Sequence, residues 1–249
     1  MAGGGLRAIA VARWPWRGIG QGPLPALLLG LTVVTGLVDA VSYVALGHVF
    51  VANMTGNVVF LGFAIAGARG LSVTASLVAL AAFFAGALAG GRICVASGPH
   101  RGRQLVAVSS AGGALLVIAA IVAAIAGTPV SPAARYGLIV ALALAMGGQN
   151  AMARRLAVPD LTTTVLTLTL TGVAADSRLA GGSGGRPARR LLAVAAMLAG
   201  ALISALLVLH VDLVLPIALA ALLVEGIALA AHRLATQPGA EWAGAPGQG

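Results

Sequence analysis

The residue best suited to chemistry in this chain is Asp39, an acid inside a long apolar run. A carboxylate within a membrane span costs about 2.5–3.5 kcal/mol on insertion scales, and acids kept there usually serve a function. Thr32, Thr35, Asp39, Ser42 and Tyr43 recur at spacings of three and four residues, which places them on one face of a helix. We expect this polar stripe to face the protein interior or a water-filled cavity. Asp39 would carry a proton or contact a cationic group there, or would only form hydrogen bonds to neighbouring helices.

A second polar segment, Asn-Met-Thr-Gly-Asn, interrupts the next apolar run at residues 53–57. Asn53, Thr55 and Asn57 are side chains that compete for backbone hydrogen bonds in the middle of a segment. If the helix breaks here, its freed amides and carbonyls, together with these side chains, can coordinate a substrate or an ion near the midplane. The alternative is amide packing between helices, typically worth about 0.6 kcal/mol per hydrogen bond.

The second half of the chain carries a matching but weaker set of polar residues. Its second acid within an apolar run is Glu225, which is either another titratable site or an acid satisfied by a neighbour. The other acids and the histidines lie at run ends or in loops, where interfacial solvation explains them, and receive no role. The wall that would face Asp39 consists of Gln149, Asn150, Thr163, Thr167 and Thr171.

Composition identifies the solvent for these residues as lipid. The 249 residues are 59% hydrophobic and only 8% charged, with a mean hydropathy of +1.02, whereas soluble domains carry about 25% charged residues. All basic residues are arginine, which excludes a P-loop NTPase and a Schiff-base lysine enzyme. The single cysteine, Cys94, excludes a disulfide framework and thiolate metal clusters. Arginines scattered between apolar runs favour a topology signal over nucleic-acid binding, and no motif points to a cofactor or a metal.

Eight apolar runs follow one another, and most approach the ~20 residues that cross a membrane. Two of them are short and polar in the middle, which favours broken or re-entrant segments buried in protein. The sequence therefore predicts an all-α polytopic membrane protein with about six transmembrane helices and two broken or re-entrant segments. The runs lie at approximately 24–47, 49–67, 72–96, 105–126, 135–153, 161–176, 189–209 and 213–232, and the two broken ones are 49–67 and 161–176.

The chain also reads as two related halves, 24–126 and 135–232, preceded by a basic cytoplasmic segment at 1–23 and followed by a disordered tail at 237–249. Each half has a helix ending in an acid or amide, a Thr-Gly break, a helix with small residues at spacings of four, and a plain apolar helix. Duplicated halves are common in transporters, and small residues at this spacing pack helices closely. The matched positions include Asp39 with Asn150, Thr55-Gly56 with Thr171-Gly172, and the packing residues Gly86 and Gly90 with Gly200 and Ser204.

The arginines favour an inverted arrangement of the halves. If all eight runs crossed the membrane, Arg92, Arg101, Arg103, Arg154 and Arg155 would lie outside. If the two broken segments enter and leave on one side, every arginine except Arg69 and Arg135 lies inside. The second arrangement obeys the positive-inside rule far better. It gives three crossings in each half, so the halves would be inverted repeats.

The stretches Gly36-Leu-Val-Asp39-Ala-Val-Ser-Tyr43, Gly47 to Asn57 and Gly148-Gln-Asn150-Ala-Met-Ala-Arg154 resemble the YoaK-like family of bacterial inner-membrane proteins, a domain of unknown function. The likeness spans about residues 25–232 and implies a multi-pass protein of the bacterial inner membrane. It brings no substrate and no catalytic residue.

The residues themselves favour a small secondary transporter or channel-like permease for an unknown solute or ion. Its polar path would pass Asp39, Tyr43 and the Thr-Gly breaks. The alternatives are a membrane-embedded enzyme that uses Asp39 and Glu225 as an acid pair, or a scaffold or sensor without transport, and an oligomer remains open.

Overall fold

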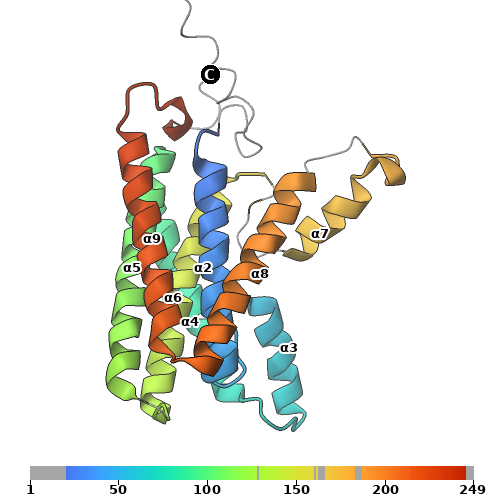
Figure 1. Cartoon of the computed structure of the whole chain (residues 1–249), viewed down its shortest axis with the longest axis vertical. Helices are drawn as coiled ribbons and strands as arrows, with labels where there is room; N and C mark the ends of the chain where they lie inside the picture. Colours follow the sequence, from blue (N-terminus) through green and yellow to red (C-terminus); the bar gives the residue numbers. More distant parts are fainter. Residues whose placement is uncertain (1–20, 128, 160, 162–165, 183–186, 245–249) are drawn as a thin grey trace, which may run out of the picture.

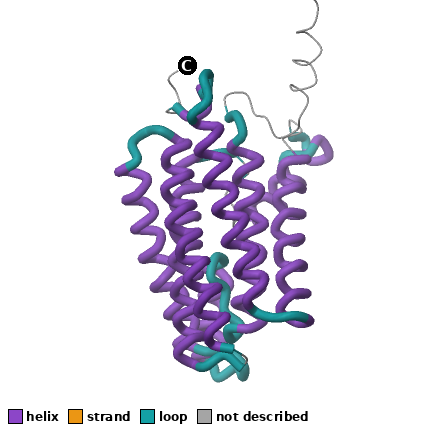
Figure 2. The backbone as a smooth tube through the Cα atoms, turned by 60° about the vertical axis from the view of Figure 1, so that its left-hand side comes forward, coloured by secondary structure: helices purple, strands orange, loops and turns teal. Residues whose placement is uncertain are grey.

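A computed structural model of the chain describes residues 21–127, 129–159, 161, 166–182 and 187–244, and this part is built from helices without strands (Figures 1 and 2). The predicted site residue Thr163 and nearly all of the basic N-terminal segment 1–23 lie outside the described residues. The α-helices are α2 (Leu24–Ala45), α3 (Met54–Ile65), α4 (Val73–Ala96), α5 (Arg101–Ala126), α6 (Pro132–Leu156), α7 (Leu166–Ala175), α8 (Pro187–His210) and α9 (Val214–Ala235). Short 3-10 helices follow at η1 (Arg178–Ala180) and η2 (Glu241–Ala243), the latter within the predicted tail.

Six of these helices are long and apolar enough to cross a membrane: α2, α4, α5, α6, α8 and α9. They have between 22 and 26 residues, and a rise of 1.5 Å per residue makes even the shortest longer than a hydrocarbon core of about 30 Å. This confirms the predicted all-helical membrane fold with six spans.

The two remaining helices, α3 and α7, are too short to cross. They have 12 and 10 residues, which corresponds to roughly 18 and 15 Å. In Figure 1, α3 lies at the lower end of the bundle and α7 at the upper end. The chain leaves α2 at the lower end and starts α4 from that same end, so α3 does not cross the bundle.

The long helices pack in three close pairs, α2 with α8, α4 with α6, and α5 with α9. Further contacts join α5 to α6 and α2 to α9, which closes the bundle. The short helices lie at its side, where α3 packs on α4 and α7 packs on α8.

Glycines let two of these pairs approach to backbone contact. On α2, a Cβ atom at Gly36 would overlap the carbonyl oxygen of Met197 on α8. On α6, a Cβ atom at Gly147 would overlap the carbonyl oxygen of Phe83 on α4. Small residues at helix contacts are the usual basis of close packing in membranes, where lipid removes the hydrophobic driving force between helices.

The glycines predicted as packing residues lie at the same two interfaces. A Cβ atom at Gly86 would overlap the carbonyl oxygen of Leu144, and one at Gly90 would come within 2.6 Å of the Cα atom of Gly148. Gly200 on α8 faces the carbonyl oxygen of Val33 in the same way.

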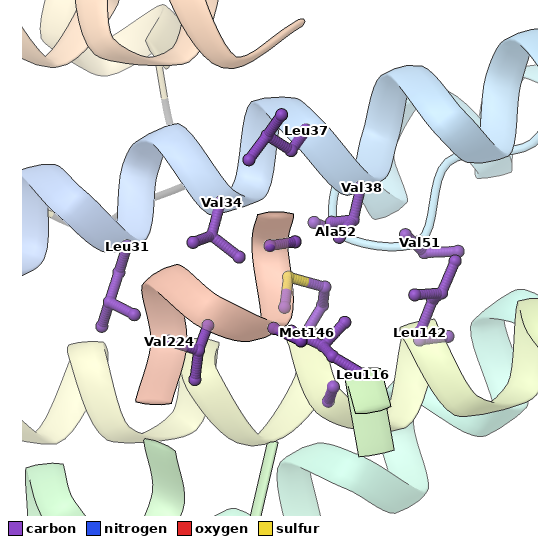
Figure 3. Close-up of a cluster of buried hydrophobic side chains, with 14 of the residues drawn as sticks. Leu31, Val34, Leu37, Val38, Val51, Ala52, Leu116, Leu142, Met146 and Val224 are labelled. Atoms are coloured by element: carbon purple, nitrogen blue, oxygen red, sulfur yellow. The ribbon is translucent and has the colours of Figure 1, made fainter. Parts of the chain in front are cut away.

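The centre of the bundle is apolar. Figure 3 shows side chains of α2, α5, α6 and α9 meeting there, together with Val51 and Ala52 from the connection between α2 and α3. Val51 and Ala52 belong to the same buried cluster as Leu142 of α6 and Val38 of α2. A non-helical segment is therefore part of the core.

Candidate functional site

The candidate site is built around the connection between α2 and α3, residues 46–53, which we call the re-entrant loop. The loop turns back after α2 through Gly47, whose φ is +101°, and His48, whose φ is +56°. Positive φ costs glycine little but is unfavourable for His48, which has a side chain. Contacts with the rest of the protein must therefore hold this turn. Val49, Val51 and Ala52 are at most 3% exposed. Backbone at this depth has no water available and must find partners in the protein.

Asp39 supplies those partners. Its Oδ1 atom accepts hydrogen bonds from the backbone amides of Val51, at 2.9 Å, and Ala52, at 2.8 Å. The side chain is 4% exposed and lies about one and a half turns before the end of α2. The carboxylate therefore fixes the depth at which the loop re-enters the bundle.

The other oxygen of Asp39 is unsatisfied. Oδ2 is buried and accepts no hydrogen bond of good geometry from any residue that the structure describes, and the backbone amide of Asn53 is a further donor close to the carboxylate. Buried polar atoms are almost always paired, so an unpaired one needs an explanation. A carboxylate with one oxygen fixed and one open can take a proton or contact a cationic or donor group.

Asn57 holds the loop from the other side. Its Oδ1 atom accepts from the amide of Phe50 at 2.8 Å, and its Nδ2 group donates to the Phe50 carbonyl at 2.6 Å. The side chain is fully buried. Asn57 thus pairs both backbone groups of one loop residue, whereas Asn53 and Thr55 are only partly buried and exposed, respectively, at the start of α3.

An aromatic cluster covers the outer side of the loop. Tyr43 stacks on Phe50 with ring centroids 5.2 Å apart and meets His48 edge-on at 5.1 Å. Phe60 of α3 stacks on Phe50 at 5.6 Å. Tyr43 is 36% exposed, so it lies where the polar stripe reaches the bundle surface.

The polar stripe of α2 faces the protein interior, and its hydroxyls mostly bond to their own helix. Thr32 donates to the carbonyl of Leu28, and Thr35 donates to the carbonyl of Leu31. Thr35 also accepts from Nε2 of Gln149 on α6 at 3.0 Å. This bond joins the two halves of the chain in the core.

The other predicted residues of the second half are less closely gathered. Asn150 is partly buried and donates to the carbonyl of Met146 in its own helix. Thr167 and Thr171 are exposed on α7, and the buried threonine of that helix is Thr169. The described contacts therefore tie Gln149 to the stripe but leave Thr171 at the surface of the bundle.

Glu225 has different surroundings from Asp39. Its carboxyl group lies against Gly113 of α5, where a Cβ atom would overlap it. Asp39 instead bonds to the re-entrant loop. The two acids thus contact separate elements, which does not favour an acid pair. Among the described residues, no group of three or more His, Cys, Asp or Glu side chains is placed to hold a metal ion.

Comparisons with known proteins show that the chain matches one protein family along most of its length. A family model described as a protein of unknown function, DUF1275, matches residues 27–230. The chain is 34% identical over 154 residues to the UPF0700 transmembrane protein YoaK of Bacillus subtilis (strain 168). That match covers 60% of this chain and 65% of the relative, so the chain spans less than two thirds of the relative's length. No solved structure matches.

Proposed function

The chain is a multi-pass membrane protein of the DUF1275 family, and we propose that it is a small secondary transporter or channel-like permease of the bacterial inner membrane. The solute or ion path passes Asp39 and the re-entrant loop. Asp39 is the group that binds or exchanges the transported or coupling species.

The observation that carries this proposal is the pairing of Asp39 with the re-entrant loop. Non-helical backbone at membrane depth is tolerated only where it is buried in protein or lines a water-filled cavity, and transporters place their solute and ion sites at such breaks. Here the break and a buried acid are hydrogen-bonded to each other, and one carboxylate oxygen stays open among the described residues. A ligand that engages Oδ2 would therefore act directly on the group that holds the loop.

The helix pairing supports an inverted repeat of the halves. Exchanging the halves exchanges the α2–α8 pair with the α6–α4 pair and leaves α5–α9 as it is. The short helices follow the same rule, since α3 packs on α4 and α7 packs on α8. Even the glycine contacts correspond: Gly36 against Met197 and Gly200 against Val33 on one side, Gly147 against Phe83 and Gly86 against Leu144 on the other. Two related halves that rock against each other are a common basis of alternating access.

The arginines support an orientation with the upper end of Figure 1 in the cytoplasm. Arg69 lies in the connection between α3 and α4, and Arg135 lies in the first turn of α6, both at the lower end. The other described arginines lie at the upper end, in keeping with the positive-inside rule. They are Arg92, Arg101, Arg103, Arg154, Arg155, Arg178, Arg189, Arg190 and Arg233.

Reporter fusions test this orientation. We expect alkaline phosphatase, which is active only outside the cytoplasm, to be active when fused after Arg69 and after Arg135. Fusions after Arg155 and after Thr236 should be inactive. Cytoplasmic signals from both Arg69 and Arg135 would contradict the three-crossing halves.

The stripe on α2 is closed in this conformation, because Thr32, Thr35, Asp39 and Ser42 are all at most 4% exposed. An occluded transporter and a static scaffold both fit a closed stripe. The open Oδ2 atom of Asp39 supports the transporter, because it is a buried acceptor that a proton or a ligand can engage.

A solute screen by thermal stabilisation tests the proposed function. A ligand that binds only the folded state raises the melting temperature, by an amount that corresponds to about 2.7 kcal/mol at a hundred times its dissociation constant. We expect at least one class of small cationic or polar solute to stabilise the purified protein and to enter proteoliposomes that contain it, with saturable kinetics. A solute that stabilises the protein but enters these vesicles no faster than empty ones would count against transport.

A further inference from the structure

A second site lies at the upper end of the bundle, away from the re-entrant loop, where α4 ends, α5 begins and α9 ends. A cavity of about 570 Å³ opens there, which we call the basic cavity. Its volume lies within the range of about 300–1,000 Å³ that is usual for small-ligand sites. Its polar lining consists of Ser97, His100, Arg103, His232 and Thr236.

Basic groups dominate the polar part of this lining, and none of the residues that line it is acidic. Arg103 is exposed, and among the described residues no carboxylate lies within salt-bridge distance of its guanidinium. His232, near the end of α9, is exposed as well. Side chains from the start of α5 and the end of α9 thus share one cavity: His100, Arg103 and His232.

The donors of these groups are available for a ligand. The Nδ1 atom of His100 accepts a hydrogen bond from the backbone amide of Arg103 at 3.1 Å. A neutral His100 ring therefore carries its proton on Nε2, where it can be donated to a ligand. Ser97 and Thr236 differ, because their hydroxyls donate to carbonyls of their own helices. The cavity therefore presents charged and imidazole donors, a set that matches the oxygens of a phosphate group.

Arg101, two residues before Arg103, has a structural role instead. It is 9% exposed, and its guanidinium donates to the Leu156 carbonyl at the end of α6 at 2.6 Å. Gly102, between these two arginines, lets α5 approach α9: a Cβ atom there would come within 2.6 Å of the Ala235 side chain. This close approach brings Arg103 and His232 to the same cavity.

The remaining lining is apolar. Val106 and Ala107 lie one turn further along α5 than Arg103, and Ala96 belongs to the last turn of α4. Val106 and Ala107 thus extend the lining from the basic groups toward the middle of the span, while Ala96 and Ala235 lie at the end of the bundle. This order is that of an anionic phospholipid, whose phosphate lies at the interface and whose acyl chains extend into the hydrocarbon core.

We propose that the basic cavity binds the phosphate group of an anionic phospholipid of the cytoplasmic leaflet, with Arg103, His100 and His232 as its donors. Basic pockets between transmembrane helices on the cytoplasmic side commonly take such headgroups. The site shares no residue with the Asp39 site, so it stands or falls independently of the transport function.

The test is lipid binding by the full-length protein in neutral detergent, measured by native mass spectrometry and by the shift in melting temperature. The probes are phosphatidylglycerol, phosphatidylcholine and inorganic phosphate. Phosphatidylglycerol should bind at least fivefold more tightly than phosphatidylcholine, and inorganic phosphate at millimolar concentration should leave the melting temperature unchanged. Equal binding of the two lipids, or stabilisation by inorganic phosphate alone, would overturn the lipid assignment.

Variants locate the binding to this cavity. Arg103→Gln should weaken phosphatidylglycerol binding about fivefold, since a basic residue near the membrane surface contributes about that factor, and Arg103→Gln with His232→Gln should weaken it further. Both side chains are exposed, and the Arg103 amide that bonds to His100 remains in the variant. The matched control is Arg178→Gln, an exposed arginine of η1 at the same end of the bundle, which should bind like the wild type. If the Arg103 variants also bind like the wild type, the proposal is wrong.

Discussion

Replacing Asp39 by alanine should destabilise the protein by about 2–6 kcal/mol. The substitution leaves the amides of Val51 and Ala52 without the acceptor that they share in the apolar core, and each unsatisfied buried donor costs about 1–3 kcal/mol. The loss falls on the re-entrant loop, which has no water to replace the carboxylate. We therefore expect a melting temperature in detergent at least about 5 °C below that of the wild type.

Two further variants test whether the loss of stability comes from the missing carboxylate oxygen. Asp39→Asn keeps an oxygen at the Oδ1 position and should retain most of the stability. Ser42→Ala removes a buried hydroxyl that, among the residues described, bonds only to the Asp39 carbonyl of its own helix, so its effect should stay below about 1.5 kcal/mol. An Asp39→Ala protein as stable as the wild type would contradict the role of the carboxylate in holding the loop.

Gly36→Ala and Gly147→Ala should each destabilise the protein by more than about 3 kcal/mol. In both cases the new methyl group would overlap a backbone carbonyl oxygen of the facing helix, which cannot rotate away as a side chain can. Overpacking costs about 1–3 kcal/mol where side chains can adjust, and more where they cannot. Because the two positions correspond in the exchange of halves, we expect similar losses of melting temperature from both.

Gly137→Ala is the matched control for Gly147→Ala, since both lie on α6 and a methyl group at Gly137 would meet no atom of a neighbouring element within 4 Å. Gly62→Ala on α3 serves as a second control for the same reason. Both should be neutral or slightly stabilising, because alanine favours helix over glycine. If alanine is tolerated at Gly36 and Gly147, the backbones of the α2–α8 and α4–α6 pairs do not approach each other as closely as we infer.

The spans were predictable from the sequence because lipid imposes a simple rule. A stretch of about 20 apolar residues is both necessary and nearly sufficient for a crossing helix. The polar interruptions at 53–57 and in the threonine-rich run correctly separated α3 and α7 from the six long helices. Their exact ends were less clear, since the first break lies in the loop before Met54 rather than around Thr55.

The surroundings of Asp39 were only partly predictable. Its spacing from Thr35 and Ser42 indicated an inward face, and these side chains are buried. The partners of the carboxylate are backbone amides of Val51 and Ala52, and backbone groups leave no signature in residue types. Only the nearby polar break suggested that unpaired amides would lie within reach.

The basic cavity was missed for a related reason. His100 and His232 lie at run ends 132 residues apart, where solvation at the interface is a sufficient explanation for each alone. Their convergence depends on the packing of α5 against α9, which apolar composition does not specify. Gly102, next to Arg103, was the available sequence signal, because a glycine in the first turn of a helix allows close approach of a neighbour.

The role of Asp39 in transport is tested by uptake of a solute found in the screen. Proteoliposomes with wild-type protein or with Asp39→Asn are compared at equal amounts of folded protein. Asparagine keeps the oxygen that holds the re-entrant loop but cannot exchange a proton or provide a negative charge. We expect the variant to keep a melting temperature close to that of the wild type and to lose at least tenfold in uptake rate. Uptake by Asp39→Asn at the wild-type rate would contradict this expectation and remove Asp39 from the transport mechanism.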